Sequence, residues 1–493
     1  MRKEHSITFN FIMNFILTAS SFVFPLITFP YVSRVLLPVG NGKIASATAV
    51  VTYFSMISML GIPTYGIRAC AQVRDNKEKL SRTVQEILII NVIMTILVYI
   101  AFGISLYLVP KFAEDRTLLI VMSSTILLNV IGVSWLYSAL EEYAYITIIS
   151  LVFKVIGVIL MFLFVHEKQD YVIYGGITVI SNVGSYIFNF LRLGNYIICR
   201  PVGNYNLKKH LKPIGIFCAM TVATSIYTNL DIVMLNFISG DEQAGYYNAA
   251  VKIKTIVTSL VTSIGAVLLP RLSYYIEKGM KEEFKKMASK ALGFVTMMSL
   301  PLSVYFMMFA NESVGLLSGA AYQPAVPSMC IIMPTVIFIG MSNIFGMQVL
   351  IPTDREKEVL ISVMIGGIVD LILNVLLIPD LGASGAAIGT LVAEFAVVLV
   401  QVIILKDFLR EIKCDYKIFP YIVALIPAAT ISWIVKRMLQ PVIQGEFLLE
   451  KSCFVILVVT AAIFFSIYGV MLLITKETIA MEYIVPYLKK IKR

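Results

Sequence analysis

The sequence has 493 residues, of which 58% are hydrophobic and only 14% charged, with a formal net charge of +10. A mean hydropathy of +0.86 excludes a water-soluble protein of this length. The basic residues are spread over many short loops, which excludes a nucleic-acid-binding domain, and the scattered cysteines and histidines predict no disulfide framework, zinc site or other cofactor.

Apolar stretches of about 20 residues, the length that crosses a bilayer, recur along the whole chain. We count about fourteen of them, and none has the alternating pattern of a membrane β-strand. The sequence therefore predicts an all-α polytopic membrane protein whose spans cover residues 7–32, 44–66, 84–109, 117–138, 144–165, 172–197, 213–238, 245–269, 289–311, 326–352, 359–379, 383–405, 418–437 and 452–474.

Lysine and arginine residues are unevenly distributed between the two sides of the membrane. With the N-terminus inside, the cytoplasmic segments hold 29 of them and the outer segments hold 8. Cytoplasmic loops are enriched in these residues, so both termini are predicted to lie in the cytoplasm. The remaining three, Lys154, Lys252 and Lys254, lie within spans.

The chain repeats itself at an offset of about 203 residues. Gly42 then matches Gly245 and Arg68 matches Arg271, so that spans one to six match spans seven to twelve. An even number of spans in each copy predicts a parallel repeat of two six-helix bundles. The predicted domains are a first bundle at 1–205, a second at 206–410, and two extra transmembrane helices with a basic cytoplasmic tail at 411–493.

The segments outside the predicted spans are short. Residues 271–290 have mixed charge at helical spacing, which predicts an amphipathic surface helix between the two bundles. No segment is long enough for a catalytic domain, and the sequence contains no phosphate-binding glycine loop of the Walker type. We therefore expect a protein that is not an enzyme.

Charged residues also lie in the seventh and eighth predicted spans. Asp231 precedes the turn between these spans by about as many residues as Lys252 follows it, and Lys254 lies half a turn further. Such matched depth predicts a polar cavity with an anion-binding lysine pair, because isolated charges inside a bilayer are unfavourable. The alternative is an ion pair that only locks the two helices together.

Two carboxylates lie near the middle of the eleventh and twelfth predicted spans. Asp370 and Glu394 are each about eleven residues into their spans, which are joined by a short turn. Together with Asp231 they are candidates for coupling transport to H⁺ or Na⁺, because two close carboxylates do not both ionise easily. The alternative is that one of them only contacts a polar neighbour such as Asn374.

Further cations lie at the ends or the middle of spans. Arg68 and Arg271 close equivalent spans at the cytoplasmic side and could guide an anionic headgroup, although either could simply extend toward the interface. Arg34 lies at the outer end of the first span, and Lys154 lies in the middle of the fifth. We predict that these four residues join Lys252 and Lys254 in binding an anionic substrate.

Four segments together make the chain resemble a known family. They are FPYVSRVLLPVGNGKIASA (29–47), LGIPTYGIRACAQVRD (60–75), TNLDIVMLNFISGDEQAGYYNAAVKI (228–253) and LGASGAAIGTLVAEF (381–395). They resemble bacterial polysaccharide repeat-unit flippases of the Wzx type, which transport O-antigen or capsule units. These flippases belong to the multidrug/oligosaccharidyl-lipid/polysaccharide exporter superfamily. One departure is at residues 37–42, where members commonly have Gly-Pro followed by an acidic residue.

The resemblance implies a fold and a function. The fold would be two six-helix bundles around a central cavity, as in multidrug and toxin extruders, plus two helices. The function would be the transfer of undecaprenyl-pyrophosphate-linked oligosaccharide from the cytoplasmic to the outer leaflet of the bacterial inner membrane by alternating access. The implied partners are the lipid-linked oligosaccharide, membrane lipids, and a polysaccharide polymerase with its chain-length machinery.

The main alternative is a multidrug and toxin exporter that exchanges cations. The intramembrane lysines argue against a cationic substrate. A polysaccharide polymerase is expected to have a large external loop, and none is present.

Overall fold

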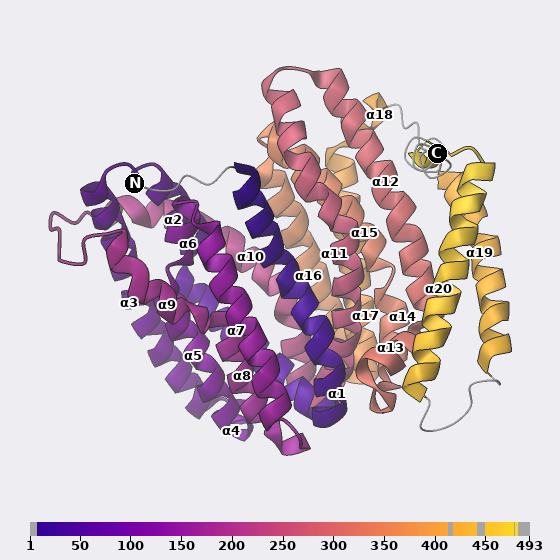
Figure 1. The fold of residues 1–493 in the computed structure, drawn as a ribbon, viewed down its shortest axis with the longest axis horizontal. Coiled ribbons are helices and arrows are strands. Elements are labelled where there is room, and N and C mark those ends of the chain that lie inside the picture. Colours follow the sequence, from indigo (N-terminus) through magenta and orange to yellow (C-terminus); the bar gives the residue numbers. More distant parts are fainter. Residues whose placement is uncertain (1–6, 413–417, 441–448, 478, 482–493) are drawn as a thin grey trace. The chain divides into compact units, whose positions relative to one another are not determined.

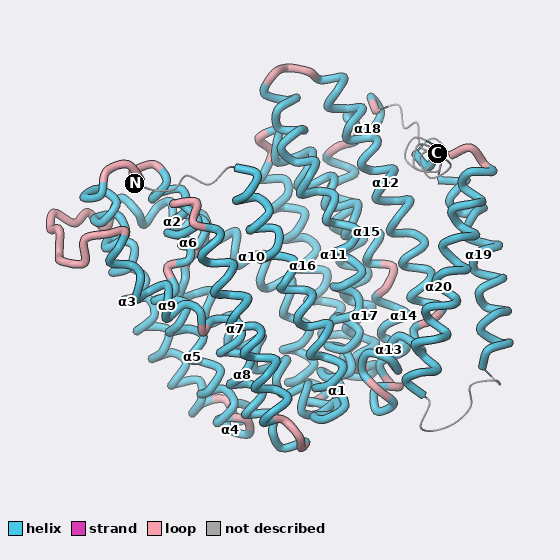
Figure 2. Tube along the Cα trace, viewed as in Figure 1, coloured by secondary structure: helices cyan, strands magenta, loops and turns pink. Residues whose placement is uncertain are grey.

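The computed structural model describes residues 7–412, 418–440, 449–477 and 479–481, and every regular element in these ranges is helical (Figure 2). The chain divides into two compact units, residues 1–245 and 246–493, which we describe separately. A helical fold is the expected form for so apolar a chain, because helices satisfy their own backbone hydrogen bonds without water.

Unit 1 consists of long helices that run alongside one another, with α1 in contact with α5, α7, α8 and α10 (Figure 1). Its elements are α1 (Ile7–Met59), α2 (Ile62–Ala71), α3 (Lys77–Leu108), α4 (Pro110–Glu114), α5 (Arg116–Gly132), α6 (Ser134–Ala139), α7 (Tyr143–Phe164), α8 (Tyr171–Val183), α9 (Ser185–Arg192) and α10 (Lys208–Ser239). The first turn of α11 (Asp241–Glu277) also belongs to unit 1, and the chain enters unit 2 within this helix.

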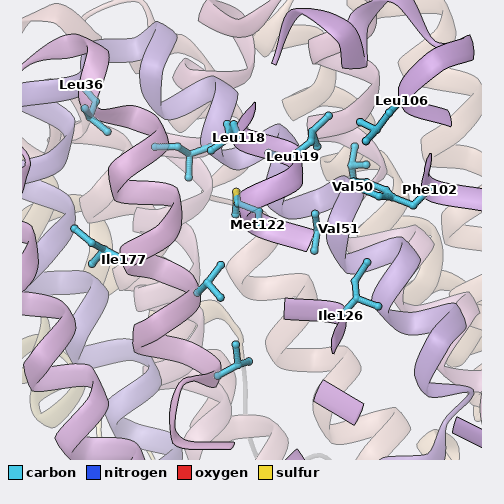
Figure 3. Packing of buried hydrophobic residues seen from close by; sticks show 14 of the residues in the cluster. Leu36, Val50, Val51, Phe102, Leu106, Leu118, Leu119, Met122, Ile126 and Ile177 are labelled. Carbon is cyan, nitrogen blue, oxygen red and sulfur yellow. The ribbon is translucent and has the colours of Figure 1, made fainter. Parts of the chain in front are cut away.

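A cluster of buried hydrophobic side chains forms a large part of the core of unit 1. Leu36 and Val50 of α1, Phe102 of α3, Met122 of α5 and Ile177 of α8 belong to it (Figure 3). Because these helices bury one face here and leave other apolar side chains exposed, the exposed side chains can face lipid.

Among the described residues of unit 1, five non-glycine residues have positive φ, and three of them, Leu37, Leu60 and Val133, are apolar. Leu37 inside α1 has φ 57° and ψ 179°, Leu60 between α1 and α2 has φ 48°, and Val133 between α5 and α6 has φ 36°. Glycine accepts such backbone conformations more easily than leucine or valine.

Replacing Leu37 with glycine should therefore leave the stability unchanged or raise it by about 1 kcal/mol, because relief of about 1–3 kcal/mol of strain offsets the loss of a half-buried side chain. Leu36→Gly is the matched control, and it should cost about 3–5 kcal/mol because Leu36 lies in the core. Thermal unfolding of both variants in the same detergent measures the difference. Equal losses in the two variants would contradict this explanation.

Unit 2 has a second helical core, in which α12, α13, α19 and α20 pack around Tyr305, Phe309 and Phe464. A π-helical segment, Asn343–Leu350, continues from α15, and α16 and α17 form an antiparallel pair. The other bounds are α12 (Lys281–Met308), α13 (Ala310–Ser318), α14 (Ala325–Ile332), α15 (Thr335–Ser342), α16 (Glu356–Leu381), α17 (Ala383–Ile404), α18 (Lys406–Glu411), α19 (Ile418–Leu439) and α20 (Leu449–Ile474).

Eleven helical segments of the described chain are long and apolar enough to cross a membrane. The first of them, Ile12–Ala71, contains the first two predicted spans, and α10 and α11 cover the predicted spans 213–238 and 245–269. The all-α membrane fold is thus confirmed, whereas the number fourteen and the domain limits at 205 and 410 stay predictions. The surface helix predicted at 271–290 is wrong, since α11 continues to Glu277 and α12 begins at Lys281.

Candidate functional site

Lys154 lies at the middle of α7, as predicted, and is buried inside unit 1 with 7% of its surface exposed. Its Nζ donates hydrogen bonds to the Oγ atoms of Ser20 (2.6 Å) and Ser21 (3.1 Å) on α1. It also lies 5.9 Å from the centre of the Phe24 ring. All of these groups are uncharged.

Lys154 has no ion pair with any residue that the structure describes. An ammonium inside a bilayer without a counter-charge costs about 2.5–3.5 kcal/mol on insertion scales. Hydroxyl oxygens compensate part of this penalty and leave the net positive charge in place. The arrangement is therefore suited to receive an anionic group from outside the protein.

The other cationic candidates of unit 1 lie in different surroundings. Arg34 on α1 is half-buried, and its guanidinium donates to the carbonyl oxygen of Pro30. Arg68 lies in the last turn of α2 and is exposed. Arg68 can therefore meet a ligand at the end of unit 1, while Lys154 can meet it in the interior.

Unit 2 contains the remaining cationic candidates, all on α11. Lys252 and Lys254 are half-buried and Arg271 is exposed. Asp231, on α10, is buried and belongs to unit 1. The predicted pairing of Asp231 with Lys252 at matched depth stays a prediction, as does the binding role of these residues.

Asp370 on α16 and Glu394 on α17 are both buried in unit 2. A methyl group on Gly389 of α17 would lie 2.6 Å from Asn374 Oδ1 and 3.1 Å from Asp370 Oδ1. This antiparallel register brings Glu394 to within about one helical turn of the level of Asp370. Within the described ranges no three His, Cys, Asp or Glu side chains form a metal-binding group.

A network of ion pairs lies at the other end of unit 1 from Arg68. Lys43 contacts Asp115 at 2.5 Å, and Lys111 contacts Glu114 at 2.9 Å and Asp241 at 3.5 Å. Burial alone would lower the pKa of Lys111, but the hydrogen bond to Glu114 and the attraction of Asp241 outweigh it and raise that pKa. The hydrogen bond from Lys111 lowers the pKa of Glu114.

The two glycines that the predicted repeat matches, Gly42 and Gly245, lie close together next to this network. A methyl group on Gly42 would lie 1.7 Å from the carbonyl oxygen of Asp241, and one on Gly245 would lie 2.0 Å from that of Pro38. Only residues without a Cβ allow these backbone segments to approach so closely. The repeat itself stays a prediction.

Several charged contacts were not predicted from the sequence. Ser20 and Ser21 carry no charge and lie more than 130 residues from Lys154 in the chain. Glu86 and Glu312 lie at the ends of predicted spans, where charges are common, yet both are almost completely buried. A search for carboxylates within a turn of a span boundary would have found these two.

Comparison with known proteins places the chain in a family. The family model described as "Polysaccharide biosynthesis protein" matches residues 7–276, more than half of the chain. The chain belongs to this family. The resemblance seen in the four sequence segments is thereby confirmed.

Two relatives of this family member are similar over most of their length. "Putative O-antigen transporter" of Escherichia coli (strain K12) is 24% identical over 394 residues, which is 80% of this chain and 95% of the relative. "Putative O-antigen transporter" of Shigella dysenteriae is 27% identical over 402 residues, 79% of this chain and 98% of the relative.

A solved structure has the same fold. "Lipid II flippase MurJ, inward closed conformation" has a TM-score of 0.69 at 16% identity and covers 94% of this chain and 100% of its own. The likeness confirms the architecture of a multi-pass helical membrane protein.

Proposed function

We propose that the chain is a flippase that moves lipid-linked oligosaccharide repeat units across the membrane for the synthesis of a cell-surface polysaccharide. Its relatives are named as O-antigen transporters, and the solved structure with the same fold is a lipid II flippase. These names describe transport, so the chain acts as a transporter and is not an enzyme.

The observation that carries this proposal is the buried charge of Lys154, which has no ion pair among the residues that the structure describes. We propose more specifically that the lipid carrier of such units is undecaprenyl pyrophosphate. This carrier is anionic at the point where lipid and glycan join. A lysine ammonium is a compact charge on a flexible stem, and it can hold a phosphate without the rigid two-point contact of arginine. That suits a group that has to leave again on the other side.

The proposed path runs from the cytoplasmic to the outer leaflet of a bacterial inner membrane, with both termini cytoplasmic. Arg68, exposed at the end of α2, would meet the headgroup first, and Lys154 would hold it in the interior. Lys252, Lys254, Arg271 and Arg34 are further proposed contacts. A polymerase with its chain-length machinery would then take up the delivered unit.

The coupling ion is proposed to be H⁺ or Na⁺, bound at Asp231, Asp370 or Glu394. Replacing all three with the matching amides should lower transport about 10- to 100-fold and remove its dependence on the ion gradient, because amides bind neither ion as a charged group. Uptake of the lipid-linked unit in vesicles measures this. Asp380→Asn, an exposed change on the same helix as Asp370, is the control. Unchanged transport in the triple variant would exclude this coupling.

A strain that lacks the chain tests the function as a whole. Lipid-linked oligosaccharide is extracted, and an impermeant probe applied to spheroplasts reports which leaflet holds it. Units trapped in the cytoplasmic leaflet and released by re-expression support the proposal, and their mass identifies the glycan. Units displayed outside but left unpolymerised would indicate a polymerase. Normal display with new sensitivity to toxic cations would indicate a cation exporter.

A further inference from the structure

Unit 1 contains a second buried ionisable cluster, separate from Lys154. Glu86 on α3 is 0% exposed and accepts hydrogen bonds from Lys209 Nζ at 2.6 Å, His210 Nε2 at 2.8 Å and the backbone N–H of Asn206 at 2.6 Å. His210, in the first turn of α10, is 2% exposed. The cluster therefore joins α3 to the beginning of α10, with Glu86 and His210 buried and the Lys209 side chain 45% exposed.

The other nitrogen of His210 contacts α2. Its Nδ1 lies 2.6 Å from the hydroxyl oxygen of Tyr65, and the two rings pack edge to face at 5.6 Å. The same helix begins after Gly61, whose backbone lies against Phe217 and Cys218 of α10. His210 thus lies between three helices and uses both ring nitrogens to connect α2 with α3.

The α3 side of this connection is held firmly. The Gln85 side chain donates to the carbonyl oxygens of Ile198 and Arg200 and accepts from the Tyr205 hydroxyl. The segment that leads into α10 is thereby fixed to α3 by several hydrogen bonds. A change in the bonding of His210 will therefore act mainly on α2.

We propose that His210 is a proton-binding site whose occupancy sets how firmly α2 is tied to α3 and α10. The titratable groups in contact with it are Tyr65 on α2 and Glu86 on α3. Lys209 on α10 contacts Glu86, and Arg68 and Cys70 on α2 act on Tyr65. Histidine is the side chain that ordinarily changes charge between about pH 5 and 8.

The two protonation states bond differently. In the neutral state, with the proton on Nε2, His210 donates to Glu86 and its Nδ1 accepts the Tyr65 hydroxyl proton. In the charged state both nitrogens donate, and the Tyr65 oxygen becomes the acceptor of a charge-assisted bond, which is roughly twice as strong as a neutral one. The buried Glu86 carboxylate lies next to the new charge. Proton uptake therefore tightens the hold on α2, and proton loss loosens it.

This site has a consequence for transport because α2 carries Arg68. With His210 protonated, Arg68 is held in place, and with His210 neutral, α2 can move together with Arg68. The link to transport rests on the proposed function, whereas the proton site depends only on the contacts of His210. The two can therefore fail separately.

Hydrogen–deuterium exchange of the full chain in lipid nanodiscs tests the proton site. After correction for intrinsic exchange, peptides covering α2 should exchange about fivefold faster at about pH 8 than at about pH 6. In His210→Gln, which keeps a donor and an acceptor but does not titrate, this pH dependence should disappear. His166→Gln is the matched control, since His166 also contacts a tyrosine, Tyr31 at 3.4 Å, but is exposed. It should keep the wild-type profile.

Tyr65→Phe provides a second variant that removes only the hydroxyl. Its α2 peptides should exchange fast at every pH. A flat wild-type profile, or a His210→Gln profile equal to that of the wild type, would overturn the proton site. If the exchange profile holds but no lipid-linked unit is moved, the proposed function fails while the proton site stands.

Discussion

Replacing Lys154 with methionine should reduce the movement of lipid-linked oligosaccharide at least about 30-fold, because loss of one partner of a buried charge contact costs about 2–5 kcal/mol. Within the described part of unit 1, the buried Lys154 ammonium contacts only uncharged groups, the hydroxyls of Ser20 and Ser21 and the ring of Phe24. Methionine fills a similar volume, so the packing of α7 on α1 should persist. The rate at which the unit moves between the two leaflets of proteoliposomes measures the loss.

The same variant should fold at least as stably as the wild type. Removing an unpaired ammonium from the membrane interior removes a penalty of about 2.5–3.5 kcal/mol, part of which Ser20 and Ser21 offset. Lys154→Arg should keep part of the activity, since it retains the charge but changes the geometry of the contact. A Lys154→Met protein with lower stability and full transport would assign this lysine a purely structural role.

In contrast to the replacement of Lys154, the replacement of Lys436 in unit 2 should destabilise the protein. Lys436 on α19 lies 2.8 Å from the carboxylate of Glu312 on α13, with side-chain exposures of 15% and 3%. Lys436→Met leaves a buried carboxylate without its counter-charge, which should cost about 3–5 kcal/mol. For a unit of this size, that lowers the melting temperature by about 6–20 °C.

Two further variants separate the ion pair from the packing around it. Replacing both partners, Lys436→Met with Glu312→Leu, should recover most of the loss, because paired buried charges and apolar groups of similar volume are often equally stable. Arg410→Met is the control, since Arg410 and Asp407 are 3.8 Å apart and exposed, and their contact should contribute at most about 1 kcal/mol. Thermal unfolding of the wild type, Lys436→Met, the double variant and Arg410→Met in one detergent measures these differences. Equal melting temperatures of Lys436→Met and Arg410→Met would show that the buried pair has no net effect.

The helices and the position of Lys154 could be predicted from the sequence for a simple reason. A span is defined by length and hydropathy alone, and a charge in its middle is visible as such. The partners of Lys154 were not predictable, because the serines of α1 are brought to α7 only by tertiary packing. The same holds for Glu86 with His210 and for Glu312 with Lys436, which join distant parts of the chain.

The two failures at the level of single helices also have physical causes. Residues 271–290 have the charge pattern of a surface helix, and the polar ends of two long helices produce the same pattern. The departure from helical geometry at Leu37 falls between the predicted spans 7–32 and 44–66, but the residue there is not a glycine, so the sequence does not indicate its positive φ. Both features depend on how long helices continue beyond the membrane, which hydropathy does not report.

The most direct test of the account uses purified protein in proteoliposomes whose lipid-linked oligosaccharide starts in one known leaflet. An impermeant glycan-modifying reagent then measures how fast the units change leaflet for the wild type and for Lys154→Met. The account predicts rapid exchange in the wild type and a loss of at least about 30-fold in the variant, with both proteins equally folded. Wild-type protein that leaves every unit in its original leaflet, or a variant that moves units as fast as the wild type, would contradict it.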